Sequence, residues 1–265
     1  MRTVLSLIIY FFIYSFLGWI SECIYCTVGN KKVVNRGFLN GPICPIYGFG
    51  ATMLIFVLKN KPQDIIYLFI CAIVLTSILE YVTGYILEKT LHTTWWDYSN
   101  KRFNIKGRIC LKNSILFGIM SVVLMKIIQP EVVSFVENIS TKTLLSLAIV
   151  GIGWLIVDII ISLMALNKLN VKLDRLDEII MDLKAFNICL DKFNEEELLS
   201  KLDKYREEDS YIQYRIEEVK DKIRNIRAKA LQVNRIIKAF PDMNKKKKQK
   251  QLQYLKEFLK EKNKN

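Results

Sequence analysis

LLSLAIVGIGWLIVDIIISLMAL forms residues 144–166, and NKLNVKLDRLDEIIMDLKA follows it directly as residues 167–185. The first stretch has 23 residues and one charged side chain, Asp158. A helix needs about 20 mostly apolar residues to cross the ~30 Å hydrocarbon core of a bilayer, so this stretch predicts a membrane span. The second stretch mixes charged residues with leucines at three- and four-residue steps. This pattern predicts that the span continues into an amphipathic helix.

The charge of the whole chain changes at the same place. Residues 1–166 carry 14 Lys/Arg and 8 Asp/Glu, whereas residues 167–265 carry 25 and 18, so the net charge of +13 divides into +6 and +7. This contrast excludes a single soluble globular domain. Positive charge beside membrane spans generally sets their orientation, so we expect no nucleic-acid partner.

Four more apolar stretches precede residues 144–166. Residues 4–25 and 65–87 have the length of full spans, whereas residues 43–58 and 114–128 are shorter, at 16 and 15 residues. The two shorter stretches could be tight spans or re-entrant segments. The sequence therefore predicts an all-α polytopic membrane helix bundle of about five spans, in a transmembrane domain over residues 1–166.

The loop charges predict an orientation for these five spans. If the charged tail is cytosolic, an odd number of spans places the N-terminus outside. The loops then expected inside hold nine Lys/Arg and those expected outside hold five, in agreement with the positive-inside rule. We therefore expect a multi-pass protein of the cell membrane with a cytoplasmic C-terminal tail.

The tail itself divides into two predicted regions. Residues 167–240 keep a seven-residue apolar repeat, and Asn194 with the acidic residues after it predicts a new helix start. Such coiled-coil-like helices could form a hairpin within the chain or join two copies as a homo-oligomer. Residues 241–265 predict a basic tail with a short amphipathic helix, either solvated or bound to anionic membrane lipid.

Several ionisable residues lie in or beside the predicted spans. A charged side chain inside lipid costs roughly 2.5–3.5 kcal/mol on insertion scales, so each one needs a partner or a function. Two interpretations remain open: a polar cavity reached by cytosolic water, or buried ion pairs that hold the bundle together. The candidate polar membrane site comprises Glu22, Arg36, Glu80, Glu88, Asp97, Arg108 and Asp158.

Glycine and proline are dense between residues 35 and 50. They break helices and leave backbone groups without intrahelical partners, which is tolerated at membrane depth only against protein or a water-filled cavity. Broken helices often form the sites of transporters, although an interfacial loop would show the same composition. The candidate broken-helix loop comprises Asn35, Gly37, Gly41, Pro42, Pro45, Tyr47 and Gly48.

Motifs of several catalytic classes are missing from the sequence. It contains no G-x-x-x-x-G-K-[ST] phosphate loop, no G-x-S-x-G turn and no H-E-x-x-H helix, and His92 is the only histidine. We therefore expect no enzymatic activity, no catalytic residue and no cofactor in this chain. Cys23 and Cys26 have the spacing of metal ligands, but no second such pair accompanies them, and we expect no metal site.

Several motifs follow one another in a fixed order along the first half of the chain. After the Gly/Pro-rich loop they read Leu79-Glu80-Tyr81-x-x-Gly84-x-x-x-Glu88, Trp95-Trp96-Asp97-Tyr98-Ser99 and Asn104-x-x-Gly107-Arg108. With Gly18-Trp19-x-x-Glu22 before the loop, this set resembles the bacterial type IV ABC-transporter permease family (CmpB-like), over roughly residues 4–130. The resemblance implies an integral-membrane permease subunit that works with a separate ATPase subunit.

Two other functions fit the same sequence features. One is a non-transporting membrane scaffold or sensor that recruits cytosolic partners through its coiled tail. The other is a membrane enzyme that acts on lipid or cell-envelope precursors through the carboxylate and arginine side chains. The resemblance names no substrate for the first hypothesis and no catalytic residues for the last.

Overall fold

The computed structural model describes most of the first 185 residues and shorter pieces of the tail. The described residues are 1–30, 36–59, 61, 64–185, 199–200, 202, 213–214, 216–222, 234–240, 243–245 and 248–261. Within these residues the only strands are one hairpin of two-residue strands, and the remaining regular structure is helical. The predicted all-α class is confirmed. Contacts divide the chain into two compact units, Met1–Ser162 and Leu163–Asn265.

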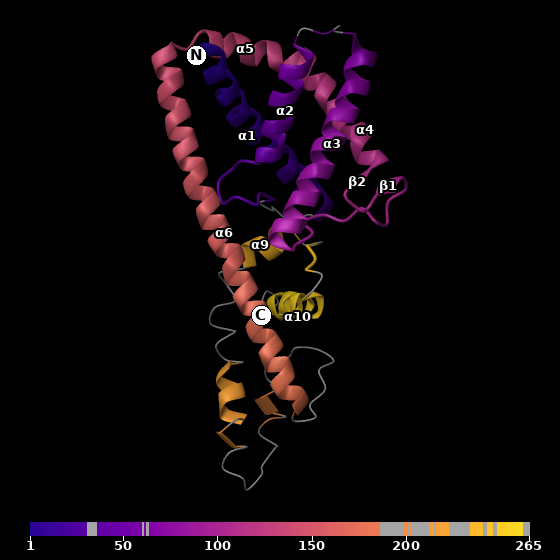
Figure 1. Ribbon diagram of the computed structural model, residues 1–265, viewed down its shortest axis with the longest axis vertical. Coiled ribbons are helices and arrows are strands. Elements are labelled where there is room, and N and C mark those ends of the chain that lie inside the picture. Colours follow the sequence, from indigo (N-terminus) through magenta and orange to yellow (C-terminus); the bar gives the residue numbers. More distant parts are fainter. Residues whose placement is uncertain are drawn as a thin grey trace. The chain divides into compact units, whose positions relative to one another are not determined.

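The first unit is a bundle of apolar helices, drawn from indigo to pink in Figure 1. Four helical stretches are long and apolar enough to cross a membrane, so the predicted membrane helix bundle is confirmed. They are Arg2–Thr27, Ile65–Leu91, Leu111–Glu137 and Thr141–Lys184. They belong to α1 (Arg2–Asn30), α3 (Ile65–Leu91), the run α4 (Leu111–Val123), η1 (Leu124–Ile128) and α5 (Gln129–Glu137), and α6 (Thr141–Ala185).

The bounds predicted for the fourth stretch, residues 114–128, are too narrow. The helical run Leu111–Glu137 has 27 residues, enough for a full span. Lys126 and the polar residues from Gln129 onward lower its hydropathy, which hides the second half from a sequence reading. Pro130 has no N–H to donate to a carbonyl of the preceding turn, and the chain passes through the π-helical turn η1 just before it.

The second apolar stretch, residues 43–58, forms the short helix α2 (Pro45–Leu58). Its 14 residues rise about 21 Å, less than the hydrocarbon core of a bilayer. Its N-cap residue, Cys44, donates its backbone N–H to the carbonyl oxygen of Ser15 at 2.9 Å. Ser15 lies close to the middle of α1, so α2 begins about half-way along that helix.

From this point α2 packs against the first half of α1. Ala51 and Ile55 of α2 share one apolar cluster with Leu5 and Ile9 of α1. The two helices approach closely because Gly48 has no side chain: a Cβ atom there would lie 2.2 Å from Oγ of Ser15. Small residues at helix contacts are a common way to pack membrane helices. The apolar part of α2 therefore covers only one half of α1.

The segment between α3 and α4 holds the only strands of the described residues, β1 (Asn104–Ile105) and β2 (Ile109–Cys110), which pair antiparallel. α3 ends at Leu91, and its C-cap residue His92 has a left-handed backbone conformation. Trp95 is buried, and its ring meets that of Phe38 edge-on with 5.0 Å between centroids. This segment therefore contacts the loop before α2.

In the second unit, α6 continues as a charged helix to Ala185, so the predicted continuation of the last span is confirmed. Its apolar face is buried through Leu169, Leu173, Leu176 and Leu183, with Ile179 rather than Ile180 between the last two. The unit also contains α9 (Asn234–Ala239) and α10 (Gln249–Glu261). The predicted helix start at Asn194 lies outside the described residues, and pairing as a hairpin or between chains stays a prediction.

Candidate polar membrane site

Glu22 connects three segments of the chain near the break before α2. It lies two helical turns beyond Ser15 on α1. Its Oε1 accepts a hydrogen bond of 2.6 Å from the hydroxyl of Tyr47, in the first turn of α2. Its Oε2 lies 3.6 Å from Nε of Arg36, which belongs to the loop between the two helices. Both charged side chains are partly exposed, about one quarter each.

Glu80 is the more deeply buried carboxylate of this region. It lies in the second half of α3 and is 6% exposed. The hydroxyl of Tyr98 donates a hydrogen bond to it, and no partner for its Oε2 occurs in the part of the chain that the structure describes. A buried carboxylate oxygen without a hydrogen-bond partner is costly.

Tyr98 bonds to Glu80 and lies within electrostatic range of Glu22. Burial raises the pKa of its hydroxyl, and the charge of nearby Glu80 raises it further, with a smaller contribution from Glu22. The side chain of Asn113, in the first turn of α4, donates a hydrogen bond that opposes this shift. Tyr98 therefore stays a protonated donor between Glu22, Glu80 and Asn113. Sequence reasoning did not assign Tyr98 or Asn113 to the site, because the aromatic run around Tyr98 is also typical of a membrane interface.

Asp158 has a different environment, on α6. It is 4% exposed, and its carboxylate accepts the backbone N–H groups of Asn40 and Gly41, each at 2.8 Å. The amide of Asn40 also donates to Asp158 and to Ser162. A Cβ atom on Gly41 would lie 2.4 Å from the Trp154 ring, so the loop backbone lies directly against α6. Asp158 therefore provides hydrogen-bond acceptors for backbone N–H groups of the non-helical loop before α2.

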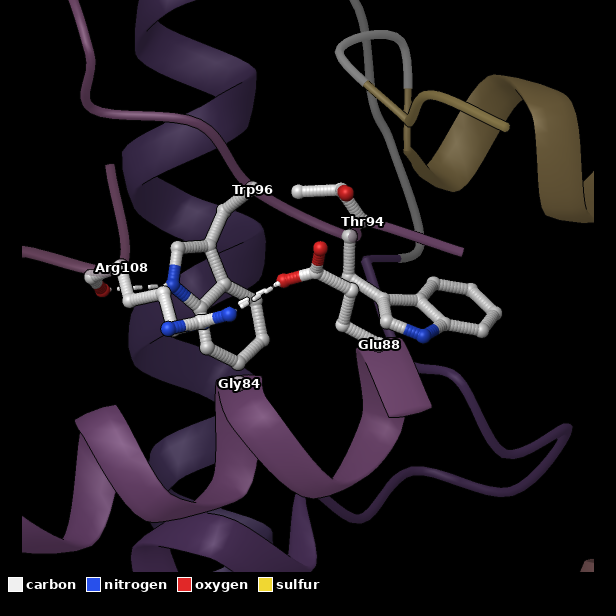
Figure 2. Close-up of a pocket in the computed structure, with 6 residues that line it drawn as sticks. Gly84, Glu88, Thr94, Trp96 and Arg108 are labelled. Carbon is white, nitrogen blue, oxygen red and sulfur yellow. Dashed lines mark hydrogen bonds and ion pairs between the residues drawn. The ribbon is translucent and has the colours of Figure 1, made fainter. Parts of the chain in front are cut away.

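Glu88 and Arg108 form an ion pair at the end of α3, seen in Figure 2. Two guanidinium nitrogens of Arg108 donate to Glu88 Oε2, at 2.8 and 3.2 Å, and a third donates to the hydroxyl of Tyr81 at 3.1 Å. The hydrogen bond to Glu88 is the main cause that raises the pKa of Arg108. Trp96 lies beside the pair and donates its indole N–H to the carbonyl oxygen of Arg108. The pair attaches the β1–β2 segment to α3.

A small pocket adjoins this ion pair. Its volume is about 10 Å³, which is space for about one water molecule. It is lined by Gly84, Glu88, Thr94, Trp95, Trp96 and Arg108. Because a substrate could not enter this volume, the Glu88–Arg108 end of the predicted site fits the ion-pair interpretation better than the cavity interpretation.

The remaining predicted residues support the backbone. Asp97 accepts hydrogen bonds from the N–H and hydroxyl of Ser99, and so holds a turn of the segment between α3 and α4. Gly37 and Pro42 lie in the loop before α2, and Pro45 starts that helix. Asn35 lies outside the described residues. Of the predicted residues, the structure thus brings together Glu22 with Arg36 and Glu88 with Arg108. Glu80 bonds to Tyr98, and Asp158 and Asp97 accept backbone N–H groups.

Comparison with known proteins gives one match. A family model described as "Putative ABC-transporter type IV" matches residues 9–163. No curated protein and no solved structure matches the chain. The matched residues run from α1 to the part of α6 that ends beside Ser162, so they include Glu22, Glu80 and Asp158.

Proposed function

This chain belongs to the putative ABC-transporter type IV family, and on this basis we propose that it is the integral-membrane permease subunit of an ABC transporter. Family membership and four long apolar helices make it a multi-pass membrane protein of transporter type. The permease role is the further step. In an ABC transporter with this chain as its permease, the ATP-hydrolysing subunit is a separate chain, since this sequence has no phosphate loop.

The break before α2 is the observation that supports this role most strongly. α2 begins half-way along α1, and the backbone before it is satisfied by Asp158 and by the carbonyl oxygen of Ser15. Non-helical backbone at membrane depth needs such partners. Many secondary transporters bind substrate at discontinuous helices near the middle of the membrane, and by analogy the same construction suits a permease.

In this proposal the substrate contacts the polar groups next to the break. Glu22 and Arg36 are each about one quarter exposed, and Glu22 bonds to Tyr47 in the first turn of α2, so this pair is our candidate for the contact with substrate. Asp158, Asp97 and the Glu88–Arg108 pair hold the surrounding backbone. The positive-inside rule puts this end of the bundle on the cytosolic side, together with the tail, which would then be available to an ATPase subunit.

The test is recovery of the partner from native membranes. The full-length chain, carrying an affinity tag, is purified in mild detergent from the membranes of the organism that makes it, and the co-purified proteins are identified by mass spectrometry. We expect an ATPase with a phosphate-loop motif at a defined stoichiometry. Recovery of soluble partners without any ATPase would contradict the permease role and would favour the scaffold or sensor.

A further inference from the structure

Glu80 has a chemistry that the permease proposal does not use. Its side chain is 6% exposed, one oxygen accepts a hydrogen bond from Tyr98, and no partner for the other is found among the described residues. Burial of an ionised carboxylate with a single hydrogen bond is unfavourable, because one hydrogen bond does not replace the hydration that the charge has lost. A positive charge on or beside the carboxylate would remove this cost.

The basic side chains of this region have other partners. In the described part of the chain no salt bridge reaches Glu80: Arg36 pairs with Glu22, and Arg108 pairs with Glu88. The titratable groups that act on Glu80 are Tyr98, by its hydrogen bond, and Glu22, by its negative charge. From α4, the facing group is the neutral side chain of Asn113.

The positive charge that fits best is a proton. A metal ion needs several ligands, and among the described residues no group of three or more His, Cys, Asp or Glu side chains could hold one. The pocket nearest along α3, beside Gly84 and Glu88, has a volume of about 10 Å³ and does not reach Glu80. A proton needs no additional volume and no further ligands.

We propose that Glu80 is a proton-binding site that carries one proton at neutral pH in the conformation described. The proton comes from water, binds Oε2 and converts the carboxylate to a carboxylic acid, while Tyr98 keeps its hydrogen bond to the other oxygen. Release returns the proton to water and leaves Glu80 and Glu22 both negative around Tyr98. The site itself is independent of the permease role; its use to couple proton release to substrate movement rests on that role.

Infrared difference spectroscopy tests this site directly. The full-length chain is reconstituted in lipid bilayers, and its absorption is compared between neutral and alkaline pH in the region where the C=O group of a protonated carboxylic acid absorbs. We expect a band at neutral pH that is lost at alkaline pH, lost in Glu80→Gln, and kept in the exposed-carboxylate control Glu131→Gln. Absence of the band from the wild-type chain at neutral pH, or its persistence in Glu80→Gln, would overturn the proposal.

A second variant separates binding at Glu80 from a general loss of folding. Tyr98→Phe removes the hydrogen bond that favours the ionised carboxylate, so the band should persist to higher pH than in the wild-type chain. A titration midpoint that does not move, or one that moves on addition of sodium chloride instead, would contradict the assignment of a proton.

This measurement needs neither a substrate nor an ATPase. A chain that recruits an ATPase but lacks the carboxylic-acid band would contradict the proton site and leave the permease role intact. A chain with the band but without any ATPase partner would contradict the permease role and leave the proton site intact. The two proposals therefore fail separately.

Discussion

At the scale of single residues, three carboxylates of the apolar helices have three different environments. Asp158 accepts two backbone N–H groups, Glu22 accepts a phenol and faces an arginine, and Glu80 has one tyrosine partner. Sequence reasoning could identify all three, since charge in an apolar span is rare. It could not distinguish them, because their partners come from segments far away along the chain.

Replacement of Asp158 should destabilise the first unit. In Asp158→Asn one acceptor oxygen becomes an NH₂ donor that faces a backbone N–H group, so we expect a loss of about 1–3 kcal/mol in stability. The measurement is thermal unfolding of the purified chain in detergent, with the exposed Glu131→Gln as control. A variant that unfolds at the wild-type temperature would show that the loop backbone does not depend on Asp158.

At the scale of elements, the close contact between α1 and α2 depends on Gly48, which has no side chain. In Gly48→Ala the new methyl group would lie 2.2 Å from Oγ of Ser15 and 2.5 Å from the backbone oxygen of Phe11. Because the backbone cannot yield as a flexible side chain does, we expect destabilisation by about 1–3 kcal/mol. Thermal unfolding measures this effect.

Gly153 on α6 provides the matched control for that substitution, because a Cβ atom there meets no other atom within 4 Å. Alanine is a better helix former than glycine, so Gly153→Ala should leave the stability unchanged or raise it slightly. Equal melting temperatures for the two variants would contradict the close packing of α1 and α2.

The helix α10 packs on the charged part of α6. Leu252 and Leu255 are buried, Lys248 bonds to Asp174, and Gln251 donates to Asp177 at 2.6 Å. Removal of a buried leucine side chain costs about 2–5 kcal/mol in other proteins, whereas exposed ion pairs contribute less than about 1 kcal/mol.

We therefore expect Leu252→Ala to speed hydrogen–deuterium exchange of the α10 amides in the full-length chain. Lys250→Ala, at an exposed position of the same helix, should leave the exchange rates close to those of the wild-type chain. Equal rates in both variants would mean that α10 does not rest on α6 in solution. The two predictions for this region, a solvated tail or a lipid-bound helix, would then both remain open.

The same elements show how far the sequence leads. Length and hydropathy were sufficient for α1, α3 and α6, because each contains more than 20 mostly apolar residues. They did not give the full helical run Leu111–Glu137, since Lys126, Gln129 and Glu131 lower its hydropathy. The start of α2 half-way along α1 depends on the Cys44–Ser15 hydrogen bond and on Gly48, and no pattern within residues 43–58 reveals such a contact.

At the scale of the whole molecule, orientation in the membrane follows from the alternation of the helices. The exposed residues Lys112 and Lys142 lie at the two ends of the span Leu111–Glu137, so they lie on opposite sides, and a cytosolic tail after α6 places Lys112 in the cytosol. Lys112→Cys should therefore react with a membrane-permeant maleimide only, and Lys142→Cys also with an impermeant one, in intact cells. Native cysteines are replaced first to remove background labelling. Reaction of Lys112→Cys with the impermeant reagent would contradict the cytosolic placement of the tail.

The central claim is that this chain is a permease whose polar groups beside the break couple to an ATPase. The most direct measurement is the ATP hydrolysis rate of the complex in liposomes, for the wild-type chain, Glu22→Gln and the exposed control Glu131→Gln. We predict that the wild-type chain and the control change the hydrolysis rate of the ATPase equally, and that Glu22→Gln loses several-fold of that effect. Hydrolysis that is indifferent to the presence of this chain, or to Glu22, would contradict the account.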